Sequence, residues 1–465
     1  MSAIGYVAVI VRAVLALAVL LSLVPFTVWL ERKGAAFIQD RPGPNRAALF
    51  GTFRLAGMAH VLADVVKLLT KEDIIPTEVY GAYYRLAPMI AAMVPLMTFA
   101  IVPLADDFSI GSFSTPLSVL RVPGGLLWFF AITSLAVYGV VFAGWASASK
   151  YSLLGGLRST AQLISYEVSM ALAVIGTILV FGTVQPNDIV RAQGQLLFGW
   201  LPQWGFVVQP VACILFLVAA FAEINRVPFD LAEGEAELVA GYHTEYSGMR
   251  FGLFFMAEYM ALVTSGAIAI TLFFGGWQIP WLPTSALIAG VGIGLPVLFL
   301  LGAVGLAGAG HWMWGWYRFY RQRGDWRAKE PRILATGAVL GAVVLLGLAG
   351  LTFVDRADLP LWVAPVFALV AQLSAFVIKL LVFCWVFVWV RWTLPRFRYD
   401  QLMNLGWKGL LPVALLNLLV TAAIAVPMGV LSWVALGVAA AILVAWYLAT
   451  RQAPPARLRG AQSGS

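Results

Sequence analysis

Carboxylic acids crowd one short stretch of the sequence between two long apolar segments. Residues 223 to 247, EINRVPFDLAEGEAELVAGYHTEYS, contain six of the 22 acidic side chains in a chain of 465 residues. These six are Glu223, Asp230, Glu233, Glu235, Glu237 and Glu245. Acids that lie close together in a region of low dielectric constant cannot all ionise, so the pKa of some of them must rise toward neutrality. Such carboxyl groups can carry protons at physiological pH.

Other charged residues lie inside apolar segments. Glu167 lies near the middle of one such segment, Glu258 about two turns into another, and Lys379 deep in a third. An acid at the centre of a membrane-spanning helix costs about 2.5 to 3.5 kcal/mol on insertion scales, so it needs a partner, water or a proton. Two interpretations stay open for each residue: a place in a proton path, or one half of a buried structural ion pair.

The acidic stretch itself has two interpretations, a solvated loop or a packed cavity. Val227, Phe229, Leu238 and Tyr242 supply apolar surface that favours burial. We therefore expect a packed, partly hydrated acidic cavity, with Glu233 and Glu237 on one face of any helical segment within it.

No pattern of metal ligands accompanies these acids. Cys213 and Cys384 are far apart and belong to no CxxC motif. His60, His243 and His311 lack the spacing of a haem or zinc site on one helix. We predict no metal site and no redox centre in this chain.

The elements that position these residues are predicted to be membrane-spanning helices. The chain is 61% hydrophobic and 11% charged, with a mean hydropathy of +0.89, whereas about a quarter of residues are charged in soluble proteins. Eleven apolar segments reach the roughly 20 residues that a helix needs to cross a bilayer. They cover residues 4–30, 82–104, 125–146, 158–182, 205–224, 250–274, 285–309, 333–354, 362–390, 407–426 and 428–449. The predicted fold is therefore an all-α polytopic membrane protein.

Basic residues in alternate links predict the orientation. Lysine and arginine are retained on the cytoplasmic side of short links, and they concentrate in the link after the first segment and in every second link from there. This places the N-terminus outside and the C-terminus in the cytoplasm. Residues 450–465 are predicted to form a disordered cytoplasmic tail.

One further helix is predicted on the membrane surface. In residues 52–73, TFRLAGMAHVLADVVKLLTKED, the polar residues His60, Asp64, Lys67 and Lys71 recur at helical spacing opposite an apolar stripe. This pattern is typical of an amphipathic helix in the membrane interface.

Four longer stretches carry a resemblance to a known family. They are ERKGAAFIQDRPGPNR (31–46), KYSLLGGLRSTAQLISYEVSM (150–170), AEINRVPFDLAEGEAELVAGYHTEYSGMRFGLFFMAEY (222–259) and VRWTLPRFRYDQLMNLGWKGLLP (390–412). Together they resemble the H subunit of bacterial NADH-quinone oxidoreductase, the respiratory complex I, over residues 1–275 and 362–426.

The resemblance implies roles for the charged residues. Glu31, Arg32, Lys33 and Arg41 would line a quinone tunnel, with Asp64 and Lys67 near its mouth. Arg226 and the acids from Asp230 to Glu245 would lie beneath the quinone headgroup. Glu167, Glu223 and Glu258 would begin the proton path toward neighbouring subunits.

The resemblance also implies a setting and partners. The chain would lie in the bacterial cytoplasmic (inner) membrane and bind quinone as a substrate. NADH, FMN and the iron-sulfur clusters would belong to other subunits. The expected partners are the hydrophilic-arm subunits at the quinone site, antiporter-like membrane subunits and membrane lipids, with no nucleic acid.

Two departures from the family pattern define the predicted domains. Residues 46–64, RAALFGTFRLAGMAHVLAD, form a longer link than the family's and lack its Gln-Pro pair. Residues 276–361 resemble a two-helix insertion with a basic, aromatic link, HWMWGWYRFYRQRGDWRAKEPR, most simply an interfacial anchor to anionic lipid. The predicted parts are thus 1–275 with the tunnel and acidic loop, the insertion 276–361, the C-terminal helices of 362–449 with an extra last one at 428–449, and the tail.

Two other functions compete with this one. A membrane anchor of an energy-converting hydrogenase would keep the acidic path, but the signatures at 31–46 and 222–230 favour the quinone enzyme. An independent proton-coupled transporter would show paired broken helices in two related halves. The sequence shows no such repeat.

Overall fold

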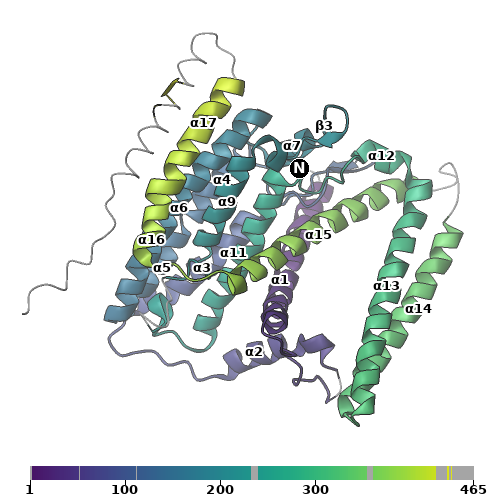
Figure 1. Cartoon of the computed structure of the whole chain (residues 1–465), viewed down its shortest axis with the longest axis horizontal. Helices are drawn as coiled ribbons and strands as arrows, with labels where there is room; N and C mark the ends of the chain where they lie inside the picture. The colour runs from purple at the N-terminus through teal and green to yellow at the C-terminus, as the bar shows by residue number, and fades with distance from the viewer. Residues whose placement is uncertain are drawn as a thin grey trace, which may run out of the picture.

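The computed structural model describes residues 3–51, 53–111, 113–231, 239–352 and 360–425, with residues 437, 438 and 441. Within these ranges the chain is mainly helical (Figure 1). The α-helices are α1 (Ala3–Ile38), α2 (Ala59–Thr70), α3 (Gly81–Phe99), α4 (Gly125–Thr133), α5 (Ala136–Ala146), α6 (Lys150–Phe181), α7 (Pro186–Gln193), α8 (Gly205–Val208), α9 (Pro210–Glu223), α11 (Gly248–Phe273), α12 (Thr284–Ala289), α13 (Val291–Gln322), α14 (Lys329–Leu351), α15 (Val363–Thr393), α16 (Tyr399–Asn404) and α17 (Leu411–Ala425). A π-helical turn, Leu405–Leu410, joins α16 to α17.

The strands are short and form two antiparallel hairpins. In the first, β1 (Phe108–Ile110) pairs with β2 (Phe113–Thr115), with Ser109 opposite Ser114. In the second, β3 (Leu196–Leu197) pairs with β4 (Leu201–Pro202). Both hairpins lie in links between helices, so the all-α class is not changed.

Eight helical segments of the described ranges are long and apolar enough to cross a membrane. They are Tyr6–Ile38, Gly125–Ala146, Lys150–Phe181, Gly248–Phe273, Val291–Gln322, Trp326–Leu351, Val363–Thr393 and Tyr399–Ala425. The polytopic helical class is therefore confirmed. The predicted segments at 82–104 and 205–224 form α3 and α9, which are outside these eight, and α9 has only 14 residues. The segment 428–449 lies almost wholly outside the described residues, so the count of eleven and the orientation stay predictions.

A tight bundle of α3, α5, α6, α9 and α11 forms the core of the molecule (Figure 1). Every residue of α11 from Leu262 to Phe273 is buried. Where α5 and α6 cross, a Cβ on Gly144 would lie 3.1 Å from Gly156 Cα, so only glycine permits this approach. This bundle is the rigid support for the acids on α6, α9 and α11.

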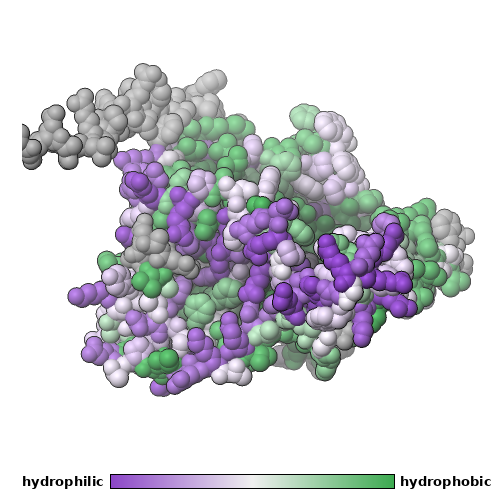
Figure 2. Space-filling view, turned by 60° about the horizontal axis from the view of Figure 1, so that its bottom comes forward, coloured by the Kyte–Doolittle hydropathy of each residue, from purple (hydrophilic) through white to green (hydrophobic). Residues whose placement is uncertain are grey.

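Three elements lie outside the bundle. Helix α15 runs obliquely past α1 and α11, and α13 and α14 form a hairpin at one side of the molecule (Figure 1). Helix α2 lies at the end of the molecule that also carries the α13–α14 link. Figure 2 shows hydrophilic residues gathered on this end, with hydrophobic surface beside them. That distribution is typical of a membrane protein seen toward one of its water-facing ends.

Lys379, on α15, is not half of an ion pair among the described residues. Its Nζ donates hydrogen bonds to the carbonyl oxygens of Phe274 (2.8 Å), Gly276 (2.9 Å) and Gln278 (2.7 Å). It also lies 4.6 Å from the centre of the Trp204 ring. The carbonyls at a helix end have no partner within the helix and carry partial negative charge. Lys379 therefore stabilises the end of α11 and the turn that follows.

Replacing Lys379 by methionine is expected to destabilise the protein. Each buried carbonyl left without a donor costs about 1–3 kcal/mol, so the midpoint of thermal unfolding of the purified complex should fall by several degrees. The exposed Lys150, at the start of α6, provides the matched Lys→Met control. Equal midpoints for the two variants would contradict this role.

Candidate functional site

An ion pair joins α1 to α15 at the base of the bundle. Glu31, on α1, is 8% exposed and pairs with Arg391, on α15. The hydroxyl of Tyr259, on α11, donates a hydrogen bond to Glu31 Oε2 at 2.9 Å. Glu31 was predicted at the site, whereas Arg391 and Tyr259 were not.

A second ion pair lies on the other side of Tyr259. Arg226 pairs with Glu258, and their side chains are only 10% and 12% exposed. The Arg226 guanidinium lies 4.8 Å from the centre of the Tyr259 ring and 5.6 Å from that of Phe255. The two pairs thus form one continuous set of groups, which we call the ion-pair cluster: Glu31, Arg391, Tyr259, Arg226 and Glu258.

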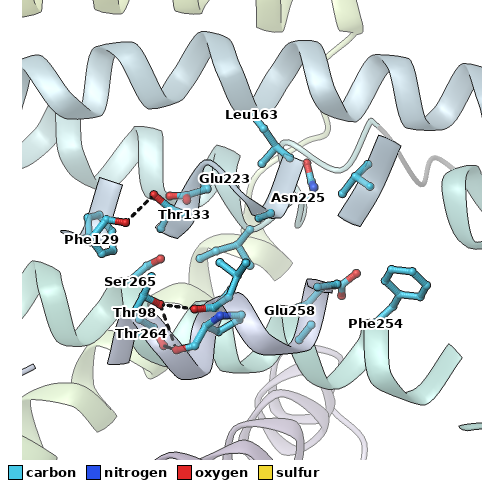
Figure 3. A pocket seen from close by; sticks show the side chains of 18 of the residues that line it. Thr98, Phe129, Thr133, Leu163, Glu223, Asn225, Phe254, Glu258, Thr264 and Ser265 are labelled. Atoms are coloured by element: carbon cyan, nitrogen blue, oxygen red, sulfur yellow. Dashed lines mark hydrogen bonds between the residues drawn. The ribbon is translucent and has the colours of Figure 1, made fainter. Parts of the chain in front are cut away.

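Glu258 also faces a cavity between α3, α4, α9 and α11. Its volume is about 90 Å³, and Glu223 and Glu258 both line it (Figure 3). A water molecule needs roughly 10–15 Å³ by this kind of measure, so several waters fit. The remaining polar lining residues are Thr98, Thr133, Asn225, Tyr242, Thr264 and Ser265. We call this space the acidic cavity.

Three threonine hydroxyls around the cavity are oriented by backbone carbonyls of α3 and α4. Thr98 donates to Val94 O at 3.0 Å, Thr133 to Phe129 O at 3.1 Å and Thr264 to Pro95 O at 3.3 Å (Figure 3). Because each proton is used on a backbone carbonyl, the oxygen lone pairs remain to accept hydrogen bonds from water or from a protonated carboxyl group.

Glu223, which lines the cavity, lies close to Glu167. Glu223 Oε2 is inaccessible to solvent and has no hydrogen-bond partner among the described residues. Glu167, on α6, lies beside Thr133 and is near enough to Glu223 for the two charges to repel each other. The structure therefore brings Glu167, Glu223 and Glu258 together from three different helices.

The start of the acidic link is fixed against α6. The Gln162 amide donates to Ala222 O at 2.7 Å and to Phe229 O at 2.9 Å. The Asn225 amide donates to the Ser159 hydroxyl at 3.0 Å. These bonds hold Arg226 in place for its pairing with Glu258.

The rest of the link is described only in part. Asp230 pairs with Arg396 at 2.8 Å. Burial raises the pKa of Asp230, and Glu258 adds to this shift, while Arg396 and Arg226 oppose it. Glu233, Glu235 and Glu237 lie outside the described residues. The backbone carbonyl of Glu245 accepts a hydrogen bond from the Tyr84 hydroxyl at 2.7 Å.

His243 lies beside the same region. Burial lowers the pKa of its imidazole, Glu258 opposes that shift, and Arg226 adds to it. The lower pKa favours the neutral imidazole at pH 7. His243 therefore adds no positive charge to the acids around it.

The predicted tunnel-mouth residues lie near α2. Arg32 pairs with Asp64 at 2.5 Å, and Lys67 lies 3.8 Å from the same carboxylate. Lys33 Nζ donates to Pro42 O at 3.2 Å. A pocket of about 400 Å³ opens beside them, and we call it the basic pocket. It is lined by Arg32, Arg41, Gly43, Pro44, Asn45, Arg46 and His60.

The predicted surface helix is present but shorter than residues 52–73. Helix α2 covers Ala59–Thr70, and Lys71 already has extended backbone geometry, so it leaves the predicted polar stripe. Leu62, Val66 and Leu69 are 50%, 58% and 62% exposed. This uncovered apolar face fits a membrane interface or a partner protein.

Among the residues that the structure describes, no group of three His, Cys, Asp or Glu side chains could hold a metal ion. Cys213 and Cys384 are buried free cysteines. The site is thus composed of ion pairs, carboxyl groups and hydroxyls, which can bind polar groups and transfer protons.

Comparisons with known proteins agree with these features. The sequence model of the family described as NADH dehydrogenase matches residues 11–422. The NADH-quinone oxidoreductase H subunit numbered 1 in Solibacter usitatus is 40% identical over 412 residues, covering 89% of this chain and 95% of the relative. The H subunit of Bdellovibrio bacteriovorus is 37% identical, covering 86% and 91%, and the H subunit numbered 2 in Geobacter sulfurreducens is 39% identical, covering 87% and 92%. This chain therefore belongs to the family of NADH-quinone oxidoreductase H subunits.

Proposed function

We propose that this chain forms the quinone tunnel of an NADH:quinone oxidoreductase and begins the path that couples quinone reduction to proton movement. The observation that carries the proposal is the continuity of the charged groups. The ion-pair cluster runs from Glu31 to Glu258, the acidic cavity continues it to Glu223, and Glu167 lies close to Glu223.

The quinone would approach from the end of the folded molecule at which α2 lies. Glu31, Arg32, Lys33 and Arg41 would line or stabilise the tunnel, and Asp64 and Lys67 would lie near its mouth. Arg32 and Arg41 both line the basic pocket, which supports a place for this region at a polar entrance. Arg226, Asp230 and the acids of 233–245 would lie beneath the headgroup.

The coupling follows from charge. Reduction of a quinone to a quinol takes up two electrons and two protons, so the headgroup is negatively charged until its protons arrive. That negative charge would compete with Glu258 for Arg226. Between poorly solvated groups a unit charge acts over several ångströms with a strength of kcal/mol. A weakened Arg226–Glu258 attraction favours protonation of Glu258, and that proton can pass through cavity waters to Glu223 and Glu167.

The other subunits supply the electrons. NADH oxidation, the flavin and the iron-sulfur clusters would belong to the hydrophilic arm, and proton transfer would continue into antiporter-like membrane subunits. This chain would contribute the polar path between them and would lie in the bacterial inner membrane.

Photolabelling of the purified complex tests the quinone site. A quinone with a photoactivatable group on its tail is expected to label peptides from residues 31–71 because α1, the following loop and α2 would frame the entrance. An excess of unmodified quinone should suppress this labelling, whereas the same photoreactive group on a fatty acid gives the background. Specific labelling restricted to other parts of the complex would contradict the proposal.

A further inference from the structure

A buried ion pair attaches the α13–α14 hairpin to the loop before α2. Arg54 Nε lies 2.7 Å from Glu330 Oε2, and the two side chains are 4% and 3% exposed. Glu330 is the second residue of α14, where a helix N-terminus favours an acid. Both helices of the hairpin are otherwise largely exposed, so this pair is a specific attachment on a loosely covered element (Figure 1).

The Glu330 carboxylate also binds the backbone of the loop. Its Oε1 accepts from Arg54 N at 2.9 Å and from Ala56 N at 3.3 Å. From the other side, Trp29 Nε1 donates to Ala56 O at 3.0 Å. Leu55 and Ala56 have φ values of +49° and +54°, which residues other than glycine rarely adopt and which persist only where the surroundings hold them. Glu330 is one of the groups that hold this turn.

Arg54 extends the attachment to Asn45 and Tyr320. Its Nη1 donates to Asn45 Oδ1 at 2.7 Å, and Asn45 Nδ2 donates to the Tyr320 hydroxyl at 2.8 Å. The Arg54 guanidinium lies 5.2 Å from the centre of the Tyr320 ring. These residues form the polar side of a cavity of about 210 Å³ between α1 and the hairpin. Breaking one partner of such a network leaves the others buried and unpaired, which is costly.

The loop that this network holds also forms the basic pocket. Asn45 lines that pocket beside Arg46, and both Arg46 N and Ala47 N donate to His60 Nε2, at 3.3 and 3.2 Å. Helix α2 starts directly after the turn at 55–57. The position of Glu330 thus determines the position of the loop and the start of α2.

We infer that the α13–α14 hairpin is a positioning element for the quinone entrance and that Glu330 is its positioning residue. This inference rests on the proposed function, because it assigns the loop at 41–57 to that entrance. We call the Arg54–Glu330 pair, together with Asn45 and Tyr320, the hairpin latch. Its role is to keep the entrance in one shape so that quinone binds without first ordering the loop.

The test replaces Glu330 by glutamine, which keeps the shape of the side chain and removes its charge. Two quantities are measured in the whole complex: amide hydrogen exchange at residues 41–58, and the kinetics of NADH:quinone reduction. Faster exchange at Arg54 and Ala56 is expected, with a several-fold higher KM for quinone and a nearly unchanged kcat. NADH oxidation with ferricyanide, which takes electrons from the arm, should be unaffected.

Two further variants keep the test decisive. Tyr320→Phe keeps the ring beside Arg54 and removes the hydroxyl that binds Asn45, so a smaller change in the same direction is expected. Arg54→Gln combined with Glu330→Gln should have a smaller effect than the sum of the two single changes, since the two side chains share one contact. Arg332→Gln, an exposed charge on the same helix, is the control and should behave as the unaltered protein.

The outcomes separate this inference from the proposed function. Unchanged exchange in Glu330→Gln overturns the latch. Faster exchange with an unchanged KM overturns its positioning role, even where photolabelling supports the quinone site. Faster exchange throughout the chain with a lower kcat shows loss of general stability and also overturns the role. If the proposed function is wrong, the unaltered complex will show it, because specific photolabelling will then be restricted to parts of the complex outside residues 31–71.

Discussion

Replacing Arg226 by methionine is expected to lower NADH:quinone reduction at least about tenfold. The change removes the arginine that pairs with the buried Glu258, and breaking a buried pair in this way typically costs about 3–5 kcal/mol. Each 1.4 kcal/mol that enters the barrier is roughly a factor of ten in rate. The long apolar methionine side chain keeps much of the contact with Phe255 and Tyr259. The measurement is the steady-state rate with a soluble quinone, at equal content of assembled complex.

Two further variants serve as controls for Arg226→Met. Arg226→Lys keeps a positive charge without the planar fork of arginine, so an intermediate rate is expected. Arg321→Met removes an exposed arginine of the hairpin and should leave the rate unchanged. If Arg226→Met reduces quinone as fast as the unaltered enzyme, the ion-pair cluster has no part in the reaction.

Much of the fold follows from hydropathy alone. Ten of the eleven predicted apolar segments contain helices, because a helix is the way for an apolar chain to satisfy its backbone in lipid. The helix ends are less predictable. Helix α1 continues to Ile38, past the charged Glu31 and Lys33, because Glu31 finds its partner on α15. Helix α9 begins only at Pro210, a residue suited to the first turn of a helix.

The acids of the candidate site were predictable because a carboxylate in an apolar segment is costly. The same argument selected Glu223 and Glu258, which line one cavity, and Glu167, which lies close to Glu223. Whether these residues transfer protons stays a prediction. For Lys379 the structure favours neither the proton path nor the ion pair, since its partners are backbone carbonyls, which leave no pattern in a sequence.

The partners of those acids could not be predicted in the same way. Arg391 is 360 positions from Glu31, and Tyr259 is 228 positions away; no local periodicity relates them. Arg391 and Arg396 did lie in one of the four family stretches, which was the available signal. Thr98 and Thr133 look like ordinary helix residues, because each bonds a carbonyl one turn earlier in its own helix.

The hairpin shows the same limit. Its basic and aromatic link predicts an anchor to anionic lipid, which stays a prediction, and its origin as an insertion also stays a prediction. Glu330 is an acid at the start of a helix, a position where acids are common. Glu330 and Arg54 become neighbours only when the chain folds. The contact of Glu330 with the entrance loop therefore could not be predicted from the sequence.

Replacing Glu223 by glutamine is expected to lower proton translocation at least about tenfold. Glutamine has nearly the shape of glutamate but cannot release a proton, so a path through this position is interrupted. Glu223 is the most informative choice, because its Oε2 has no hydrogen-bond partner in the described part of the chain and Glu223 forms no ion pair there. In contrast, Glu258→Gln would also break the pair with Arg226.

The central claim is that the acidic cavity carries the protons that quinone reduction sets in motion. Its most direct test is the initial rate of pH change inside liposomes that contain the complex, with NADH oxidation recorded in parallel. Glu78→Gln, at an exposed acid, serves as the control. We predict that Glu223→Gln loses proton translocation while the control keeps it. Translocation by Glu223→Gln at the rate of the unaltered complex would contradict the claim.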